Sequence, residues 1–90
     1  IKPDYAEAHT NLGLAYHQKK ELILATNAFT RALSIKPDLG EALFGLALVY
    51  RDQNEYKKAM DYAQKAIKSG KKVSPVFMKK LQEKVSQISP

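Results

Sequence analysis

The sequence contains no cysteine, and none of its apolar runs approaches the length of a membrane span. The lack of cysteine excludes disulfide bonds, thiol chemistry and cysteine-based zinc sites. A bilayer-spanning helix needs about 20 consecutive apolar residues, so we expect no membrane span. The two histidines, His9 and His17, are eight residues apart, whereas a helical metal pair needs i, i+4 spacing. We therefore expect no metal and no cofactor.

The sequence also shows no arrangement of residues that is typical of a catalytic site. The sequence has no glycine-rich phosphate loop and no Ser-His-Asp constellation. Glu7 and Glu41 are the one imaginable pair of carboxylates, but both fall at expected helix starts that face solvent. Acid–base catalysis requires a burial that these positions do not provide. The protein is therefore predicted not to be an enzyme.

What the sequence does contain is an internal repeat. Residues 1–4 read Ile-Lys-Pro-Asp, and the same four letters return at residues 35–38, after a shift of 34. Leu12 and Tyr16 likewise correspond to residues of the same type 34 positions later. A fixed period of this length indicates stacked supersecondary units, which commonly present an extended concave surface to a partner.

The residues inside the first unit follow the pattern W-x2-L-G-x2-Y, A-x3-F and P of a 34-residue helical repeat. The matching positions are His9 (in place of Trp), Leu12, Gly13, Tyr16, Ala25, Phe29, Ala32 and Pro37. The chain therefore resembles the tetratricopeptide repeat family over residues 4–70. The second unit departs from the pattern at Ala63, which replaces the aromatic residue.

The resemblance implies an all-α fold, an α–α superhelix (solenoid) of two helix-turn-helix repeats plus a C-terminal capping helix. In this interpretation residues 1–4 are the tail of a preceding repeat, and residues 5–38 and 39–72 are repeats one and two. Residues 74–88 are expected to form the capping helix, because their apolar residues lie on one stripe, and a separate partner-binding helix is the less favoured alternative. We expect the chain to be a fragment of a larger protein.

Five helices are predicted from the apolar spacing and the terminal signals, over residues 5–18, 22–35, 39–52, 55–69 and 75–88. The expected helix-start residues are Asp4, Asp38, Asn54 and the pair Ser74-Pro75, and Gly70 is the expected stop. Gly13 is predicted to allow close approach of the 22–35 helix, and Leu12 is predicted to fill the core. Phe77 and Leu81 are predicted to pack against the 55–69 helix.

The resemblance places the first helix of each repeat on the concave face, where a ligand groove is expected. The candidate binding residues are Asn11, Leu14, His17, Phe44, Leu48, Arg51, Met78 and Lys79. Four of them, Leu14, Phe44, Leu48 and Met78, are expected to form an exposed apolar strip that internal packing does not need. Gly45 is expected to lie in the same groove.

The predicted function is a non-catalytic scaffold that binds a peptide or helix segment of a partner protein in this concave groove. The alternative is a self-association module that forms a homodimer through exposed repeat faces. Binding of an acidic partner or a nucleic acid is less favoured. It would use the lysine-rich residues 46–90, which hold ten Lys/Arg and four Asp/Glu and carry the whole net charge of +6. The expected location is the cytoplasm.

Overall fold

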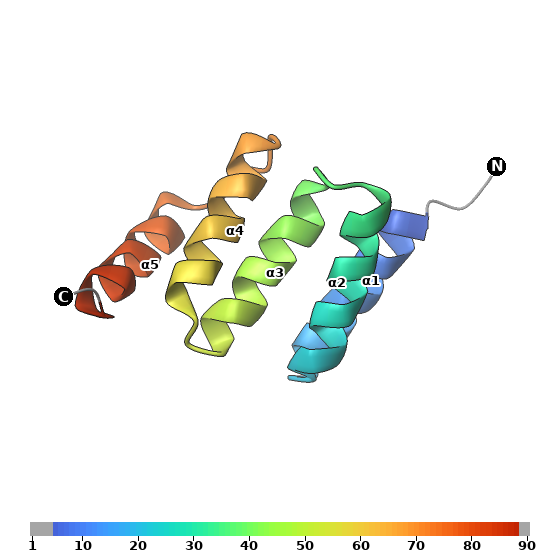
Figure 1. Ribbon diagram of the computed structural model, residues 1–90, viewed down its shortest axis with the longest axis horizontal. Coiled ribbons are helices and arrows are strands. Elements are labelled where there is room, and N and C mark those ends of the chain that lie inside the picture. The colour runs from blue at the N-terminus through green and yellow to red at the C-terminus, as the bar shows by residue number, and fades with distance from the viewer. Residues whose placement is uncertain (1–4, 89–90) are drawn as a thin grey trace.

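The computed structural model describes residues 5–88, and within that range it contains five α-helices and no β-strand (Figure 1). Each helix lies within one residue of its predicted bounds, so the all-α prediction is confirmed. The helices are α1 (Tyr5–Gln18), α2 (Leu22–Ile35), α3 (Gly40–Asp52), α4 (Tyr56–Lys68) and α5 (Pro75–Ile88).

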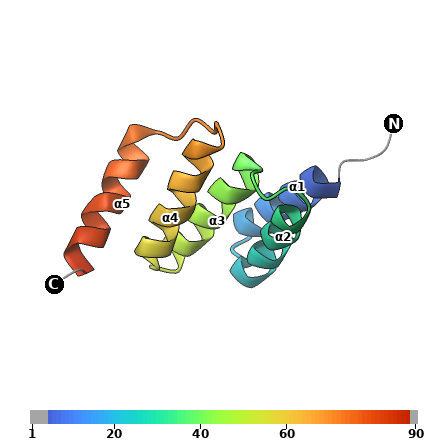
Figure 2. The same ribbon diagram turned by 45° about the horizontal axis from the view of Figure 1, so that its top comes forward.

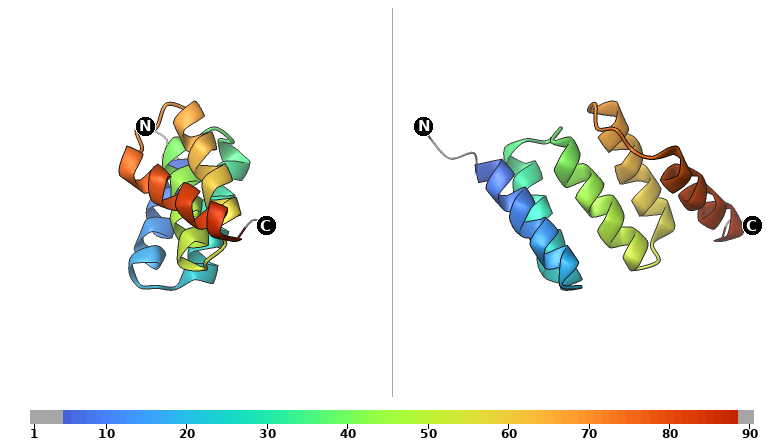
Figure 3. Two further views of the ribbon diagram at one scale, coloured as in Figure 1. Left: turned by 90° about the vertical axis from the view of Figure 1, so that its left-hand side faces the viewer. Right: turned by 180° about the vertical axis from the view of Figure 1, so that it is seen from behind.

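The helices follow one another from end to end of an elongated molecule that measures 50 × 27 × 19 Å. α1 and α2 form one antiparallel pair, and α3 and α4 form the next (Figures 1 and 2). α3 also packs on α2, and α5 packs on α4 at the opposite end from α1 (Figure 3). The architecture is therefore a helical repeat solenoid, in which neighbouring helices stabilise one another.

The turns after α1, α3 and α4 share the same backbone conformation and hydrogen-bond pattern. In each turn one residue takes a left-handed conformation: Lys20 at φ 64°, Asn54 at φ 63° and Gly70 at φ 104°. The following residue donates its N–H to the carbonyl five positions earlier, at 2.9–3.0 Å. This is the Schellman arrangement that ends many helices, and it confirms Gly70 as a helix stop.

Of the predicted helix-start residues, only Ser74 is confirmed as a cap. The backbone N–H of Val76 donates to Ser74 Oγ at 3.2 Å. The prediction for Asn54 was wrong, because Asn54 takes the left-handed turn position and its side chain accepts a hydrogen bond from the Tyr56 hydroxyl at 2.7 Å. The prediction for Asp38 was also wrong, since Leu39 precedes α3 and no side chain caps that helix. Asp4 lies outside the described residues.

The centre of the first core cluster is Phe29, whose side chain on α2 is fully buried. Gly13 of α1 and Gly45 of α3 both face its ring. A Cβ atom at Gly13 would lie 2.7 Å from ring carbons, and one at Gly45 would lie 2.3 Å away. The predicted close approach at Gly13 is confirmed. The expectation that Gly45 lies in the groove was wrong, because Gly45 is buried against this ring.

Leu12 does not fill the core as predicted, because its side chain is 45% exposed. The residue that corresponds to it in the second repeat, Leu46, is only 2% exposed. The difference arises because α2 covers that face of α3, whereas no described helix covers the corresponding face of α1.

The second core cluster joins α5 to α4, as predicted for the capping helix. Leu81 is 2% exposed and packs with Ala59, Met60 and Ala63 of α4. Phe77 is half-buried against the same cluster. The apolar stripe of α5 therefore faces α4.

The substitution Gly45→Ala should destabilise the protein. The new Cβ would overlap the enclosed Phe29 ring, and overpacking of this kind costs about 1–3 kcal/mol, which exceeds the gain in helix propensity of about 1 kcal/mol. We expect a net loss of up to about 2 kcal/mol in the free energy of unfolding, measured by urea titration. A second substitution, Phe29→Leu, should recover part of that loss. Unchanged or increased stability of Gly45→Ala would contradict this account.

The substitution Lys20→Gly should stabilise the protein. The left-handed conformation costs an ordinary L-residue about 1–2 kcal/mol, and glycine avoids that cost at some entropic expense in the unfolded chain. A net gain of roughly 0.5–1 kcal/mol is expected from chemical unfolding. Asn54→Gly is the comparison and should gain less, because asparagine tolerates this conformation and because the substitution removes the hydrogen bond from the Tyr56 hydroxyl. A loss of stability in Lys20→Gly would show that the turn is not strained.

Candidate functional site

A cavity of about 250 Å³ opens between α1 and α3. Its apolar wall is made by Leu14 and Leu39, and the exposed Asn11 supplies an amide beside them. Thr10 also lines the cavity, but its hydroxyl donates to the Ala6 carbonyl at 2.8 Å. The complete lining is Glu7, Thr10, Asn11, Leu14, Leu39 and Glu41. This arrangement suits an apolar side chain next to a group that hydrogen-bonds.

Glu41, which lines the cavity near the start of α3, forms an ion pair with the segment between α4 and α5. Lys71 Nζ donates to Glu41 Oε1 at 2.6 Å. The same ammonium lies 5.7 Å from the centroid of the Phe44 ring. In the sequence Lys71 stands out only as one of the lysines of residues 46–90, because a contact between residues 30 positions apart has no local signal.

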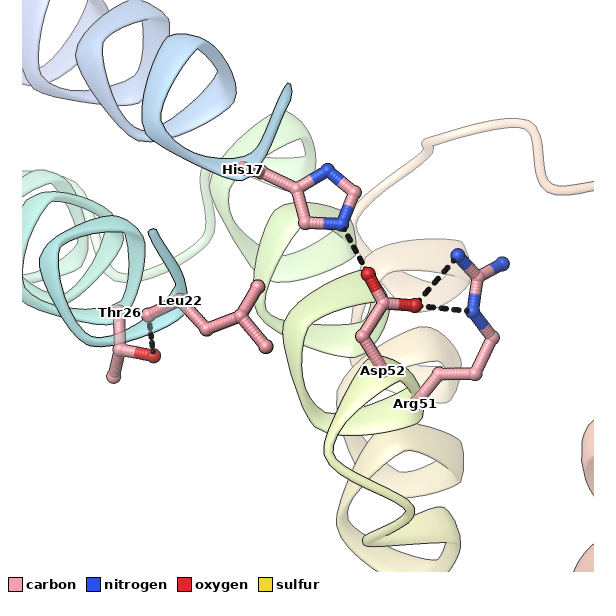
Figure 4. Close-up of polar contacts among 5 residues, drawn as sticks. All are labelled: His17, Leu22, Thr26, Arg51 and Asp52. Atoms are coloured by element: carbon pink, nitrogen blue, oxygen red, sulfur yellow. Dashed lines mark hydrogen bonds and ion pairs between the residues drawn. The ribbon is translucent and has the colours of Figure 1, made fainter. Parts of the chain in front are cut away.

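At the other end of these helices, three side chains form one polar network (Figure 4). His17 Nε2 donates to Asp52 Oδ2 at 2.8 Å, which joins the last turn of α1 to the end of α3. Arg51 donates to Asp52 Oδ1 through Nε at 3.1 Å and through Nη2 at 3.0 Å. His17 and Arg51 were both predicted site residues, and the carboxylate of Asp52 brings them together.

The Asp52 carboxyl is a partly buried group with an altered acidity. Burial by itself would raise its pKa, but the hydrogen bonds from His17 and Arg51, together with the charges of these two residues, lower the pKa below the ordinary value. The carboxylate form is therefore favoured in the folded protein.

The capping helix reaches this network through an aromatic contact. The rings of Phe44 and Phe77 lie 5.2 Å apart between centroids at an angle of 59°. The guanidinium carbon of Arg51 lies 5.5 Å from the centroid of the Phe77 ring. α5 is therefore joined to α3 on the same side as the network, and Arg51 is held between a carboxylate and a ring.

The predicted apolar strip is less exposed than expected. Leu14, Phe44, Leu48 and Met78 are all half-buried. Leu14 packs against the first core cluster, and Phe44 and Met78 pack against the second, so the expectation that internal packing does not need these three was wrong. Lys79 is exposed on α5.

Within residues 5–88, no group of three or more His, Cys, Asp or Glu side chains is arranged to hold a metal ion. None of the helices in that range combines the length and apolar character that crossing a membrane requires.

Comparison with known families identifies both repeats. Models of the tetratricopeptide repeat match residues 6–39 and residues 40–71. These matches cover most of the chain, and the chain belongs to the tetratricopeptide repeat family. Such repeats are generally protein–protein interaction modules, and they are typically non-catalytic scaffolds. A search of curated proteins found no match.

The substitution Asp52→Asn should lower the stability of the folded protein at neutral pH and have a smaller effect on its stability in acid. Because the folded pKa of Asp52 is lower than the unfolded one, its stabilisation is complete above the ordinary carboxyl pKa of about 3.9 and is lost as the pH falls through the folded value. We expect Asn to reduce the free energy of unfolding by about 1–2 kcal/mol at pH 7. The difference should shrink near pH 2.5, measured by urea titration. An equal loss at both pH values would contradict the charged network.

Proposed function

We propose that the concave side formed by α1, α3 and the start of α5 binds a peptide or short helix of a partner protein. The observation that supports this proposal is the cavity between α1 and α3, which is next to the predicted site residues Asn11 and Leu14. Its position matches the groove that the family resemblance implies. The repeat family supplies the general class, a protein-interaction module.

The lining of the cavity indicates the kind of segment it would take. Leu14 and Leu39 offer an apolar wall for one side chain of the ligand. The amide of Asn11 both donates and accepts, so it suits the backbone of an extended peptide. Lys79 is exposed on α5 and would favour an acidic residue further along the same ligand.

Nucleic-acid binding receives less support from the basic half of the chain. Base recognition by stacking uses accessible aromatic faces. Tyr62 stacks on Tyr50 with ring centroids 5.5 Å apart, and Lys65 lies 4.9 Å from the Tyr62 ring centroid. Lys84 covers Tyr56 in the same way, at 5.7 Å. These rings are engaged with groups of the protein itself.

The proposed groove is tested with peptides selected from a random display library against the whole chain. Asn11→Arg places a long cation at the cavity mouth without disturbing the core, because Asn11 is exposed. We expect it to weaken the selected peptides at least about tenfold, a loss of about 1.4 kcal/mol. The matched control is Asn27→Arg, an exposed asparagine on α2, which should change affinity by less than about twofold.

Binding in an apolar cavity should also persist between 0.1 and 0.5 M salt. Binding through the lysines of α4 and α5 would instead fall steeply over that range. If Asn11→Arg and Asn27→Arg leave peptide affinity equally unchanged, the cavity is not the binding site.

A further inference from the structure

Another cavity, of about 240 Å³, opens where the turn before α3 meets the last turn of α4. We call it the α4 cavity, and its lining is Pro37, Asp38, Leu43, Lys65, Lys68 and Ser69. It shares no lining residue with the cavity between α1 and α3, which Glu41 lines. Residues two apart on a helix point in nearly opposite directions, so Leu43 and Glu41 place the two cavities on different sides of α3.

The apolar part of the α4 cavity lies where the repeat pattern has a larger side chain. Leu43 stands at the Trp position of the pattern W-x2-L-G-x2-Y, and Leu46 and Tyr50 follow it at the expected spacing. Leucine is smaller than tryptophan and leaves space beside it, and Pro37 adds a second apolar surface to the lining. The cavity therefore offers an apolar contact to a side chain that comes from outside.

Two lysines of α4 place positive charge beside this apolar contact. Lys65 and Lys68 are exposed and three residues apart, so they lie on the same side of the helix. Neither forms an ion pair within residues 5–88. Lys65 Nζ lies 4.9 Å from the centroid of the Tyr62 ring, a contact that leaves its N–H groups available to an anion. Both ammonium groups can therefore bind carboxylates of a ligand.

The charge around the cavity has one sign on the α4 side. Residues 62–82 contain six lysines and no aspartate or glutamate. The acidic member of the lining is Asp38, which belongs to the turn between α2 and α3. Acidic groups of a ligand would therefore lie toward α4 and away from that turn.

The first repeat does not reproduce this combination. The residues 34 positions before Leu43, Lys65 and Lys68 are His9, Arg31 and Ser34. An imidazole thus replaces the apolar side chain, and one of the two cations is missing. The α4 cavity is therefore a feature of the second repeat alone and does not follow from the repeat pattern.

We propose that the α4 cavity binds an acidic segment of a partner protein. One aromatic or large aliphatic side chain of that segment enters the cavity, and neighbouring Asp or Glu residues bind Lys65 and Lys68. The volume fits one side chain better than a whole small molecule, because small-molecule sites measure about 300–1,000 Å³. A nucleic acid fits less well, since the aromatic rings nearby are engaged with groups of the protein itself. This surface is separate from the groove between α1 and α3 and does not depend on it.

The test titrates the whole chain with a synthetic peptide that carries one phenylalanine between glutamates, followed by NMR of the ¹⁵N-labelled protein. The amide signals of Leu43 and Lys68 should shift and saturate with a Kd below about 1 mM. Replacing the phenylalanine of the peptide by alanine should weaken binding at least about fivefold. Replacing its glutamates by glutamines should have an effect of the same size. No saturable shift up to about 1 mM would overturn the proposal.

The variant that fills the cavity is Leu43→Trp, and it should weaken the peptide at least about fivefold. The matched control is His9→Trp, at the corresponding position of the first repeat, which should change affinity by less than about twofold. The repeat pattern has Trp at both positions, so both variants should keep a cooperative thermal transition. Equal affinities for the two variants would show that the cavity takes no side chain and would overturn the proposal.

The charges are tested with a surface variant that leaves the core intact. Lys65→Glu together with Lys68→Glu should weaken the peptide at least about tenfold. The matched control is Lys57→Glu together with Lys84→Glu, two exposed positions near Tyr56 at the opposite end of α4. Lys57 is about 12 Å from Lys65 along the helix axis. At about 0.15 M salt, charges more than about 8 Å apart are largely screened, so the control should lose less than about threefold.

Two further results separate this surface from its alternatives. Asn11→Arg, which blocks the groove between α1 and α3, should leave binding of the acidic peptide unchanged, whereas loss of binding in that variant would move the peptide to the groove and overturn the proposal. Equal losses for the two double-glutamate variants would mean that the peptide only follows the net charge. Tighter binding of a single-stranded oligouridylate than of the acidic peptide would assign the lysines to nucleic acid. Either result would overturn the proposal.

Discussion

The arrangement of the first three helices depends on one aromatic ring placed between two glycines. The Phe29 ring is fully buried, and it meets the backbone of α1 at Gly13 and the backbone of α3 at Gly45. Side chains at either position would push the helices apart, because protein interiors have little free volume. The ring therefore sets how closely α1 and α3 approach, and these two helices are the walls of the candidate binding cavity.

Polar contacts lie at both ends of the proposed groove. At one end Lys71 binds Glu41, and at the other Asp52 holds His17 and Arg51. Both contacts cross between elements that are distant in sequence, so they restrict the relative positions of neighbouring helices. In the proposed function, such contacts would hold the groove in place before a peptide binds, and preorganisation of this kind reduces the free energy that ordering costs on binding.

The five helices, the repeat period and the close approach of α2 to α1 at Gly13 could be predicted from the sequence. They could be predicted because they follow from local residue pattern and spacing. It was insufficient where equivalent residues have different neighbours. Leu12 and Leu46 share a repeat position, yet Leu12 is exposed and Leu46 is buried. The reason is that α2 covers this face of α3, whereas no helix among residues 5–88 covers the same face of α1. The burial of Gly45 was also not predicted, because it depends on the Phe29 ring of α2, which lies on another helix. The role of Asp52 depended on contacts across 35 residues, which no local signal reveals.

The order of the helices in space also bears on how the chain folds. Each helix packs chiefly on the helices next to it in sequence, so few contacts require the closure of long loops. Chains rich in such local contacts fold in microseconds to milliseconds. In a linear array the interior units have neighbours on two sides and the terminal units on one. Opening of the native state should therefore begin at α1 and α5 and reach the helices around Phe29 and Leu46 last, which gives the molecule a gradient of local stability along its 50 Å axis.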